Sequence, residues 1–439
     1  MYKILNEILT ITQIIWIFSS ETFLYFIFKD LISYIKRLTQ KLAQVNILYV
    51  KLFQAIASNN NLISDDLNVE LLKFTDNVPW GYNDIHIIKL FQLEKKYNLR
   101  LEDGYEYPMN SGMISLVYKA YKREDGLPVI IKMKRKNIEI KLNNAIENLK
   151  TFLYLLSFIP IIHKYDIKNI IEQNIEIIKN QTNFKQEIKN ILKIKNNCEN
   201  LKYVKIPQVY PNVTYDYDDD FIMMEFIDGI KINEIKKEDY IGFSKPVIKF
   251  GLVTTIVHGV CHGDLHSGNI LFIKDENDAN YPYKIGVIDF GIIFELENEY
   301  REFLFDWFIH ILRRTPSDTI IFFLNSNVIQ PPNIMKKIPI EYYDSIVDIG
   351  SKLITNAIND SKQINQIQIF EFLSKLKEYL DTDELKKLGI KPSASFVKSQ
   401  LVLAMAHGVT MTLCKDNYKK LFNHVLNELF HTDLIMDDE

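Results

Sequence analysis

Two short glycine-flanked segments constrain this chain more than any other feature of its sequence. HGDLHSGNIL occupies residues 262–271, and KIGVIDFG follows at residues 284–291. Only 15 of the 439 residues are glycine, yet six of them fall between residues 251 and 291. Such clustering indicates backbone conformations that residues with side chains rarely adopt. The pattern predicts a loop, an apolar strand, a turn and a second apolar strand, in that order.

The acidic and amide residues of these segments are spaced for magnesium and phosphoryl-transfer chemistry. Asn269 follows Asp264 by five residues, and Asp289 begins an Asp-Phe-Gly turn. In a kinase-type catalytic loop the first aspartate orients or deprotonates the acceptor, while the asparagine and the second aspartate hold Mg²⁺ on the nucleotide phosphates. Asp264 is therefore the candidate catalytic residue, and Asn269 and Asp289 are the candidate metal ligands.

A zinc site is the competing interpretation of the same stretch. Three histidines recur every four residues, close to a cysteine and an aspartate: His258, Cys261, His262, Asp264 and His266. On one helix they would form a metal-binding stripe. The glycines interspersed among them disfavour a continuous helix, so the magnesium interpretation is preferred. His262 and His266 are then expected to hydrogen-bond within the loop.

A kinase-type loop requires an upstream lysine and a glutamate that holds it. VIIK at residues 129–132 is an apolar run that ends in Lys132, which is positioned to bind the α- and β-phosphates. Glu187, in NFKQEIKN, lies on a predicted helix between this strand and the next strand-like segment. A glutamate on a lysine-rich helix is ordinary by itself. Both assignments therefore depend on the downstream motif.

The segment PMNSGMISLVYKA at residues 108–120 is the candidate phosphate-covering turn. It is neither a G-x-G-x-x-G loop nor a Walker loop. Backbone N–H groups around Asn110, Ser111, Gly112 and Met113 are nevertheless suited to cradle phosphate.

The segment MMEFIDG at residues 223–229 follows an apolar strand. Its position predicts a connector between two lobes, where backbone groups would meet adenine. Glu225 and Phe226 are the residues expected at that contact.

With these segments the sequence resembles the UbiB (aarF-domain, ADCK-type) family of atypical kinases, over roughly residues 40–300. HGDLHSGN is similar to the family's H-x-D-x-H-x-G-N loop, and PMNSGMISLVYKA is similar in length and frame to its alanine-rich nucleotide loop. VKLFQ at residues 50–54 resembles the family's K-x-G-Q segment. That segment is expected to fold over the active site, with Lys51 and Gln54 as its functional side chains.

The resemblance implies ATP and Mg²⁺ as cofactors and activity as an ATPase or a small-molecule or lipid kinase. It also implies a role in isoprenoid-quinone or membrane lipid metabolism, with a membrane surface or a lipid or quinone precursor as partner. A homodimer is left open. The fold that it implies is α+β and protein-kinase-like, with a small antiparallel-sheet lobe and a large, mainly helical lobe.

The expected segments follow from this architecture and from the hydrophobic pattern. An N-terminal helical extension with the K-x-G-Q-like segment covers residues 1–100. The small lobe covers residues 101–228 and includes a helical insert at residues 138–200. The helical lobe, with the catalytic loop and the Asp-Phe-Gly turn, covers residues 229–439.

The sequence departs from the family pattern at three places, one of which is the alanine-rich loop, where Asn110, Ser111, Gly112 and Met113 stand instead. The glycine of the K-x-G-Q segment is Phe53, and an expected E-x-D pair falls on Gln181 and Asn183. Neutral amides cannot compensate the charge of Lys51 as carboxylates would. The resemblance therefore leaves the charge balance of the pocket and its preference for nucleotide or metal open.

Two other functions stay open. One is a phosphotransferase of the aminoglycoside- or choline-kinase type, since those enzymes also have a HGDLHxxN loop before a DFG-like turn. The other is a nucleotide-binding pseudokinase scaffold without turnover, which the altered K-x-G-Q and E-x-D positions favour.

Residues 8–28 form an apolar run, ILTITQIIWIFSSETFLYFIF, interrupted by Glu21. A secretory signal would have a more basic start and a small-residue cleavage site, and a glutamate near the centre of a membrane span is unfavourable. A buried or partner-facing helix is the first expectation, a helix on a membrane surface the second, and a true span the third.

Composition excludes several other classes of protein. The net charge of −4 gives no basic footprint for nucleic acid. The three cysteines are widely separated and odd in number, which excludes a disulfide framework and favours a reducing compartment.

Overall fold

The computed structural model divides the chain into two compact units, which are described separately. The first unit comprises Met1–Leu192 and Pro207–Ile227, and the second comprises Lys193–Ile206 and Asp228–Glu439. The structure describes residues 2–46, 48–49, 78, 80–156, 175, 179–210, 219–359, 391–393, 395–396, 406, 408–414 and 417–429.

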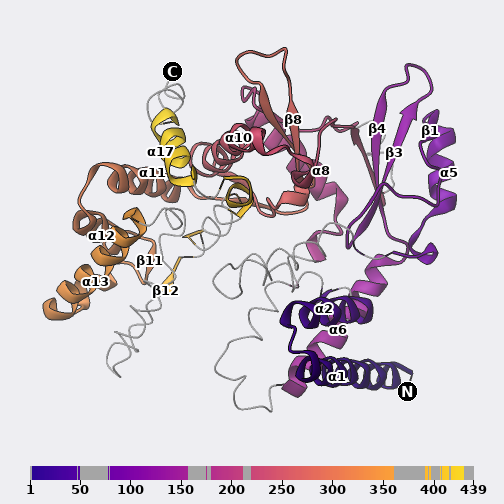
Figure 1. Ribbon diagram of the computed structural model, residues 1–439, viewed down its shortest axis with the longest axis horizontal. Helices are drawn as coiled ribbons and strands as arrows, with labels where there is room; N and C mark the ends of the chain where they lie inside the picture. Colours follow the sequence, from indigo (N-terminus) through magenta and orange to yellow (C-terminus); the bar gives the residue numbers. More distant parts are fainter. Residues whose placement is uncertain are drawn as a thin grey trace. The chain divides into compact units, whose positions relative to one another are not determined.

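The first unit begins with a hairpin of two long helices, α1 (Tyr2–Phe28) and α2 (Leu31–Val45), which lie side by side in Figure 1. The Asp30 side chain accepts a hydrogen bond from the Ser33 N–H at 3.1 Å and so caps the start of α2. At the end of α2 the Asn46 side chain donates to the Ala145 carbonyl at 2.9 Å. This bond ties the hairpin to α6 (Ile138–Leu156).

An antiparallel sheet forms the centre of the first unit, with the strand order β1-β3-β4-β6 and β2 paired with β3. Its strands are β1 (Leu99–Leu101), β2 (Asn110–Ser111), β3 (Ser115–Lys122), β4 (Pro128–Lys134) and β6 (Phe221–Glu225). The helix α5 (Ile87–Lys96) lies beside the sheet in Figure 1. Its buried Leu90 and Leu93 pack with Leu116, Tyr118 and Ile131 of the strands.

The second unit is mainly helical. Its helices are α10 (Tyr240–Leu252), the π-helical turn η5 (Val253–Val257), α11 (Asn298–Arg313), α12 (Pro316–Leu324), α13 (Ile340–Asn359) and α17 (Tyr418–Glu428). Short 3-10 turns are η3 (Ile232–Glu234), η4 (Lys237–Asp239), η6 (Ser267–Asn269) and η7 (Ile334–Lys337), and η1 (Tyr82–Asp84) belongs to the first unit. The helix α8 (Phe184–Asn197) begins in the first unit and ends in the second.

Three small sheets accompany these helices. One has the order β5-β9-β8, from β5 (Val204–Lys205), β9 (Tyr283–Val287) and β8 (Ile270–Lys274). The other two pair β7 (Val260–His262) with β10 (Ile293–Glu295), and β11 (Ile329–Gln330) with β12 (Lys391–Pro392).

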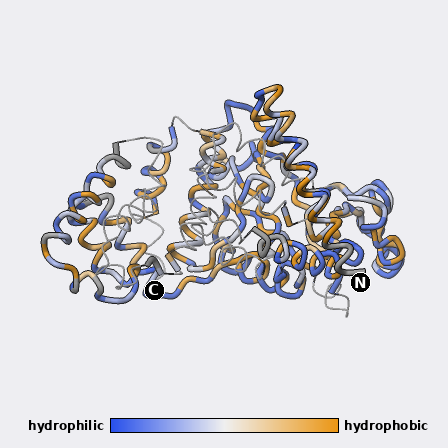
Figure 2. Tube along the Cα trace, turned by 90° about the horizontal axis from the view of Figure 1, so that it is seen from below, coloured by the Kyte–Doolittle hydropathy of each residue, from blue (hydrophilic) through white to orange (hydrophobic). Residues whose placement is uncertain are grey.

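Among the described residues, two apolar clusters hold the helices of the second unit. Trp307 of α11, Phe323 of α12 and Ile346 of α13 are buried in one of them. Leu252 of α10 and Phe422 of α17 belong to the other. Hydrophobic and hydrophilic residues are interspersed along the helices in Figure 2, as expected for helices that each bury one face.

The predicted α+β class is confirmed, with an antiparallel-sheet unit, a mainly helical unit and N-terminal helices. The two strands predicted between the catalytic loop and the Asp-Phe-Gly turn are present as β8 and β9. The N-terminal helix has one buried face, with Ile14, Ile17 and Glu21, as first expected, but its other face is exposed. The proposed segment boundaries at residues 100 and 228 stay predictions.

Candidate active site

Lys132 lies on the central strand β4 of the sheet, opposite Val117 of β3 and Ile222 of β6. Its ammonium group forms an ion pair with Glu187, with 2.6 Å between Nζ and Oε1. The lysine side chain is 8% exposed and the glutamate side chain 2%. The structure therefore brings together the two residues that the sequence paired across 55 positions.

The helix that presents Glu187 is fixed at its start by a residue of the altered E-x-D pair. The side-chain oxygen of Asn183 accepts a hydrogen bond from the Gln186 N–H at 3.0 Å, which is an N-cap arrangement. Phe184, Ile188 and Ile191 are buried at helical spacing. Because Glu187 lies on the same face, burial of this stripe directs its carboxylate inward.

An aromatic ring supports the same lysine. Lys132 Nζ lies 5.7 Å from the centroid of the Phe184 ring, and Lys134 Nζ lies 5.4 Å from it. An aromatic face attracts cations at this range. Neither contact is predictable from the sequence, because neither Phe184 nor Lys134 belongs to a motif.

The candidate phosphate-covering turn is closed upon itself. The Ser111 N–H donates to Asn110 Oδ1 at 2.7 Å, and the Gly112 N–H donates to the Ser115 carbonyl at 2.9 Å. The Ser111 hydroxyl donates to the Val78 carbonyl at 2.8 Å, and the Met113 side chain is buried. Two of the N–H groups expected to cradle phosphate, those of Ser111 and Gly112, are therefore engaged within the turn, and binding through them requires the turn to rearrange.

Arg135 anchors this turn and was not singled out from the sequence. Its Nε donates to the Gly112 carbonyl at 3.0 Å and its Nη2 donates to the Val78 carbonyl at 3.1 Å. Its Nη1 forms an ion pair with Asp84 at 3.1 Å. Burial of Asp84 raises its pKa, but hydrogen bonds from Lys141 and from the Gly81 N–H, with the nearby Arg135 charge, outweigh burial and leave the pKa below its usual value.

Of the two predicted connector residues, Glu225 ends the strand β6 and Phe226 follows it. Glu225 exchanges two hydrogen bonds with the Gln208 backbone: its N–H donates to the Gln208 carbonyl at 2.7 Å, and its Oε2 accepts from the Gln208 N–H at 3.1 Å. The Phe226 ring lies 4.7 Å from Lys119 Nζ. A role for these residues at adenine stays a prediction.

The predicted catalytic loop lies between β7 and β8 in the second unit. A side chain at residue 263 would collide with Ile292, since an added Cβ would lie 2.5 Å from Ile292 Cγ2. Glycine there allows its own N–H to donate to the Ile292 carbonyl at 2.9 Å. The loop then passes through Asp264 into η6, which ends at Asn269.

Asp264 and Asn269 are joined directly. The Asn269 side-chain nitrogen donates to the Asp264 carbonyl at 2.9 Å. Because that nitrogen is engaged, the amide oxygen of Asn269 is the atom left for a cation. His266 stabilises the same turn: its N–H donates to the Asp264 carbonyl at 2.9 Å, and its Nδ1 accepts from the Gly268 N–H at 3.1 Å.

His262 connects this loop to the Asp-Phe-Gly turn. Its Nδ1 accepts from the Asp264 N–H at 3.1 Å, and its Nε2 is hydrogen-bonded to the Asp289 carbonyl. These partners assign the neutral tautomer with the proton on Nε2. Burial lowers the pKa of the His262 imidazole below its usual value, which agrees with a neutral ring.

Asp289 is placed beside Asn269 by the pairing of β8 and β9. The register joins Ile270 to Val287, and the Ile288 N–H donates to the Asn269 carbonyl at 2.9 Å. Asp289 itself has φ of 66°, a left-handed conformation that is uncommon for residues other than glycine. Its Oδ1 accepts from the Gly291 N–H at 3.1 Å.

The donor set suits Mg²⁺ better than zinc. Carboxylate and amide oxygens from Asp289 and Asn269 are hard ligands of the kind that Mg²⁺ takes in small number, with phosphates and water completing its shell. His262 has no lone pair for zinc, because one ring nitrogen donates and the other accepts a hydrogen bond. The histidines also lie on different elements, since His262 ends β7 and His266 precedes η6.

The structure thus brings the predicted residues together in two groups. Lys132 and Glu187 form one in the first unit, and Asp264, Asn269 and Asp289 form the other in the second. Lys51 and Gln54 lie outside the described residues. That both groups meet one nucleotide stays a prediction.

Curated relatives of the chain are proteins named "Probable protein kinase UbiB". The protein of that name from Shewanella putrefaciens is 27% identical over 287 residues, covering 64% of this chain and 51% of that protein. The one from Shewanella oneidensis is 27% identical over 289 residues, with the same coverage. The chain therefore spans about half the length of these relatives.

Solved structures similar to the chain include the Rio2 kinase from Chaetomium thermophilum in an ADP/Mg²⁺-phosphoaspartate complex, which is 14% identical with a TM-score of 0.28. That match covers 58% of this chain and 75% of the other. The family model described as the ABC1 atypical kinase-like domain matches residues 74–319, more than half of the chain. The chain therefore belongs to the ABC1 atypical kinase-like family.

Proposed function

We propose that this protein binds ATP with Mg²⁺ and acts as an atypical kinase or ATPase in membrane lipid or isoprenoid-quinone metabolism. Family membership and the relatives' name, "Probable protein kinase UbiB", support the kinase-like chemistry. The class of pathway rests on the resemblance of the sequence motifs to the UbiB family.

The observation that carries the proposal is the buried ion pair of Lys132 with Glu187. A buried pair is a poor device for stability, because removing two charges from water offsets most of their attraction. The same pair is well suited to hold an ammonium group in one position for a polyanion. A nucleotide phosphate is the ligand that this chemistry fits best.

In the proposed reaction Lys132, oriented by Glu187, would neutralise phosphate charge. Asn269 and Asp289 would hold Mg²⁺, which when bound supplies further neutralisation on the phosphates. Asp264 would orient the attacking hydroxyl or water and accept its proton. Most of the rate enhancement would then be electrostatic positioning.

Nucleotide binding to the purified chain tests the proposal, with Lys132→Met as the informative variant. Loss of the ammonium group should weaken Mg-ATP binding at least about tenfold, since charge-assisted contacts to phosphate are among the stronger polar interactions. Lys249→Met is a matched control, because Lys249 of α10 also pairs with a glutamate, Glu428 of α17 at 3.1 Å, and its side chain is 12% exposed. Equal affinity of the Lys132 variant and the wild type would refute the assignment.

Turnover separates this function from its competitors. Hydrolysis that rises with lipid vesicles or phenolic quinone precursors supports the proposal. Phosphorylation of small alcohols or amines would instead favour the aminoglycoside- or choline-kinase type. Binding without turnover under every condition would favour a nucleotide-binding scaffold.

A further inference from the structure

The polarity of α1 is inverted relative to an ordinary surface helix. Its outward face consists of exposed aliphatic and aromatic side chains: Ile8, Leu9, Ile15, Trp16, Phe23, Phe26 and Ile27. Trp16 is 71% exposed and Phe26 is 70% exposed. The opposite face, which packs inward, contains the one charged residue between positions 8 and 28, Glu21. A helix whose outward face contacted water would expose its charged residue and bury its large apolar side chains.

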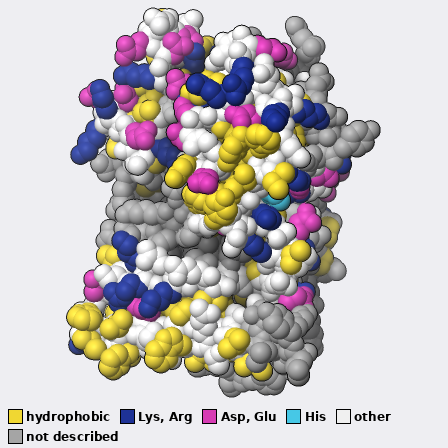
Figure 3. Space-filling view, turned by 90° about the vertical axis from the view of Figure 1, so that its right-hand side faces the viewer, with side chains coloured by type: hydrophobic (Ala, Val, Ile, Leu, Met, Phe, Trp, Pro, Cys, Tyr) yellow, Lys and Arg dark blue, Asp and Glu magenta, His cyan; other side chains and the backbone are white. Residues whose placement is uncertain are grey.

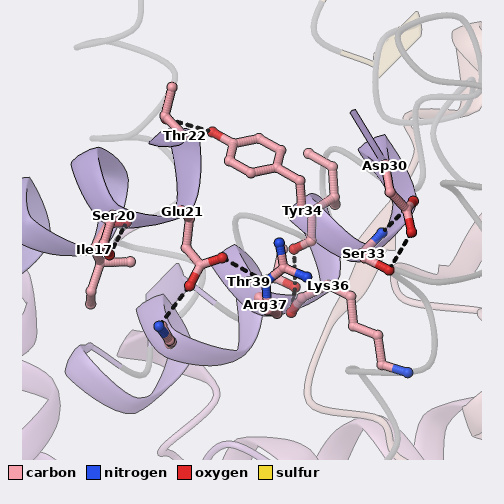
Figure 4. Close-up of polar contacts among 12 residues, drawn as sticks. Ile17, Ser20, Glu21, Thr22, Asp30, Ser33, Tyr34, Lys36, Arg37 and Thr39 are labelled. Atoms are coloured by element: carbon pink, nitrogen blue, oxygen red, sulfur yellow. Dashed lines mark hydrogen bonds and ion pairs between the residues drawn. The ribbon is translucent and has the colours of Figure 1, made fainter. Parts of the chain in front are cut away.

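Glu21 is fully neutralised inside the helical hairpin. Its carboxylate accepts from Arg37 Nε at 2.7 Å and from Lys41 Nζ at 2.6 Å, and its side chain is 0% exposed (Figure 4). Both cations come from α2, which packs against α1. The interruption that made residues 8–28 a poor membrane segment in the sequence therefore does not lie on the outward face.

Hydroxyl groups of α1 are satisfied by the helix itself. The Thr12 hydroxyl, which lies on the outward face, donates to the Ile8 carbonyl at 2.8 Å, and the Ser20 hydroxyl donates to the Ile17 carbonyl at 3.1 Å. Side chains that bond back to their own helix tolerate apolar surroundings. Contact with hydrocarbon would leave these groups paired.

The length of the helix suits a membrane, but its ion pairs exclude a span. Ile8–Phe28 is long and apolar enough to cross a bilayer, with 17% of it buried. The other described candidate, Lys237–Val257, is 67% buried as a core helix. Glu21 is well inside α1, while Arg37 is 36% exposed and Lys41 is 47% exposed. In a span these cations would sit within hydrocarbon, whereas in a helix along the surface they stay at the water side.

The exposed charges of α2 and of the turn that joins it to α1 are mainly positive. Lys29, Lys36 and Lys41 are exposed and Arg37 is half-buried. The one exposed acid of the turn, Asp30, accepts hydrogen bonds from Ser33. Figure 3 shows hydrophobic side chains gathered along the lower edge, where α1 lies in Figure 1, with Lys and Arg side chains close by. Cations that border an apolar face complement anionic lipid headgroups.

From these observations we infer that α1 is a membrane-docking helix, which lies in the plane of an anionic bilayer surface with its outward face among the acyl chains. The Glu21 cluster keeps the single acid of the helix on the protein side. This inference does not depend on nucleotide binding, and its failure would leave the proposed function intact.

Vesicle binding by the full chain tests the inference. We expect cosedimentation with phosphatidylcholine vesicles that contain phosphatidylglycerol, weaker binding without the anionic lipid, and a decrease with salt. Phe23→Gln with Phe26→Gln should weaken binding at least about tenfold. Ile88→Gln with Ile140→Gln is the matched control, because these side chains are also highly exposed on helices of the first unit, at 75% and 62%. Binding of the control pair should match that of the wild type.

Trp16 reports the depth of the helix. Its fluorescence should shift to shorter wavelength on vesicle addition and be quenched most by lipids brominated near the glycerol end of the chains. The shift should be absent in Trp16→Phe, which retains Trp80 and Trp307. Strongest quenching by bromine at the chain ends would overturn the surface orientation.

Two further results would overturn the inference. One is the absence of binding to both vesicle types. The other is a concentration-dependent dimer that the Phe23→Gln/Phe26→Gln pair abolishes while vesicle binding is unchanged, because a second copy would then cover the helix. Unchanged ATP affinity in the Phe23/Phe26 variant separates either result from a failure of the active-site assignment.

Discussion

The imidazole of His262 donates from Nε2 to the main-chain carbonyl of Asp289, 27 residues further along the chain. Its other nitrogen accepts from the Asp264 N–H at 3.1 Å. One buried ring therefore sets the backbone of the predicted catalytic aspartate and of the predicted metal ligand together. No charge on the ring is needed, because both bonds are made by the neutral tautomer.

Replacing this ring by a phenyl group should destabilise the second unit without leaving a cavity where the imidazole was. His262→Phe keeps the volume and the edge-to-face packing on Phe290, but it leaves the Asp264 N–H and the Asp289 carbonyl without their partner. We expect a loss of about 2 kcal/mol in the free energy of unfolding, measured by urea denaturation. His424→Phe, at a histidine 63% exposed on α17, should change it by less than about 0.5 kcal/mol. Equal effects of the two variants would contradict the bridging role.

The same ring predicts a dependence of stability on pH. Burial lowers the pKa of His262 in the folded state, while the unfolded value is about 6.5. The unfolded chain therefore binds more protons between these two values. The contribution of His262 to stability is fully present above about pH 6.5 and is lost as the pH falls towards the folded-state pKa. His262→Phe should lose stability less steeply than the wild type over that interval, and parallel curves would exclude His262 as the titrating group.

The sequence predicted which residues lie together where motif spacing or order along the chain carries the signal. Lys132 and Glu187 were paired from their order along the chain, and Asp264, Asn269 and Asp289 from their spacing. It did not predict the contacts of Arg135 with Asp84, since these residues are 51 positions apart and neither belongs to a motif. The neutralisation of Glu21 by Arg37 and Lys41 was missed for a related reason. The hydrophobic pattern predicts which face of a helix is buried, but not which other element packs against that face.

Asn183 stands where the family's E-x-D pair would have its aspartate, and it still has a structural role. Its amide caps α8, the helix that presents Glu187. Asn183→Ala should lower stability by about 1 kcal/mol and weaken Mg-ATP binding, because the first turn of α8 positions the carboxylate that holds Lys132. Thermal unfolding and nucleotide titration would measure the two effects. Asn183→Asp preserves the cap and interacts favourably with the helix dipole, so it should retain both the stability and the Mg-ATP affinity of the wild type. If it lost as much stability and affinity as Asn183→Ala, the result would argue against capping.

Asp289→Asn should abolish the Mg²⁺-dependent part of ATP binding. Asparagine is among the residues that best tolerate positive φ, so the backbone at φ of 66° and the bond from the Gly291 N–H are retained while the negative charge is lost. Titration of ATP with and without Mg²⁺ should then give equal affinities for the variant. Asp306→Asn, at an exposed acid on α11, should keep the full effect of the metal. Because the variant differs from the wild type mainly in charge, an undiminished response to Mg²⁺ would mean that Asp289 is not a metal ligand, and the magnesium assignment would fail with it.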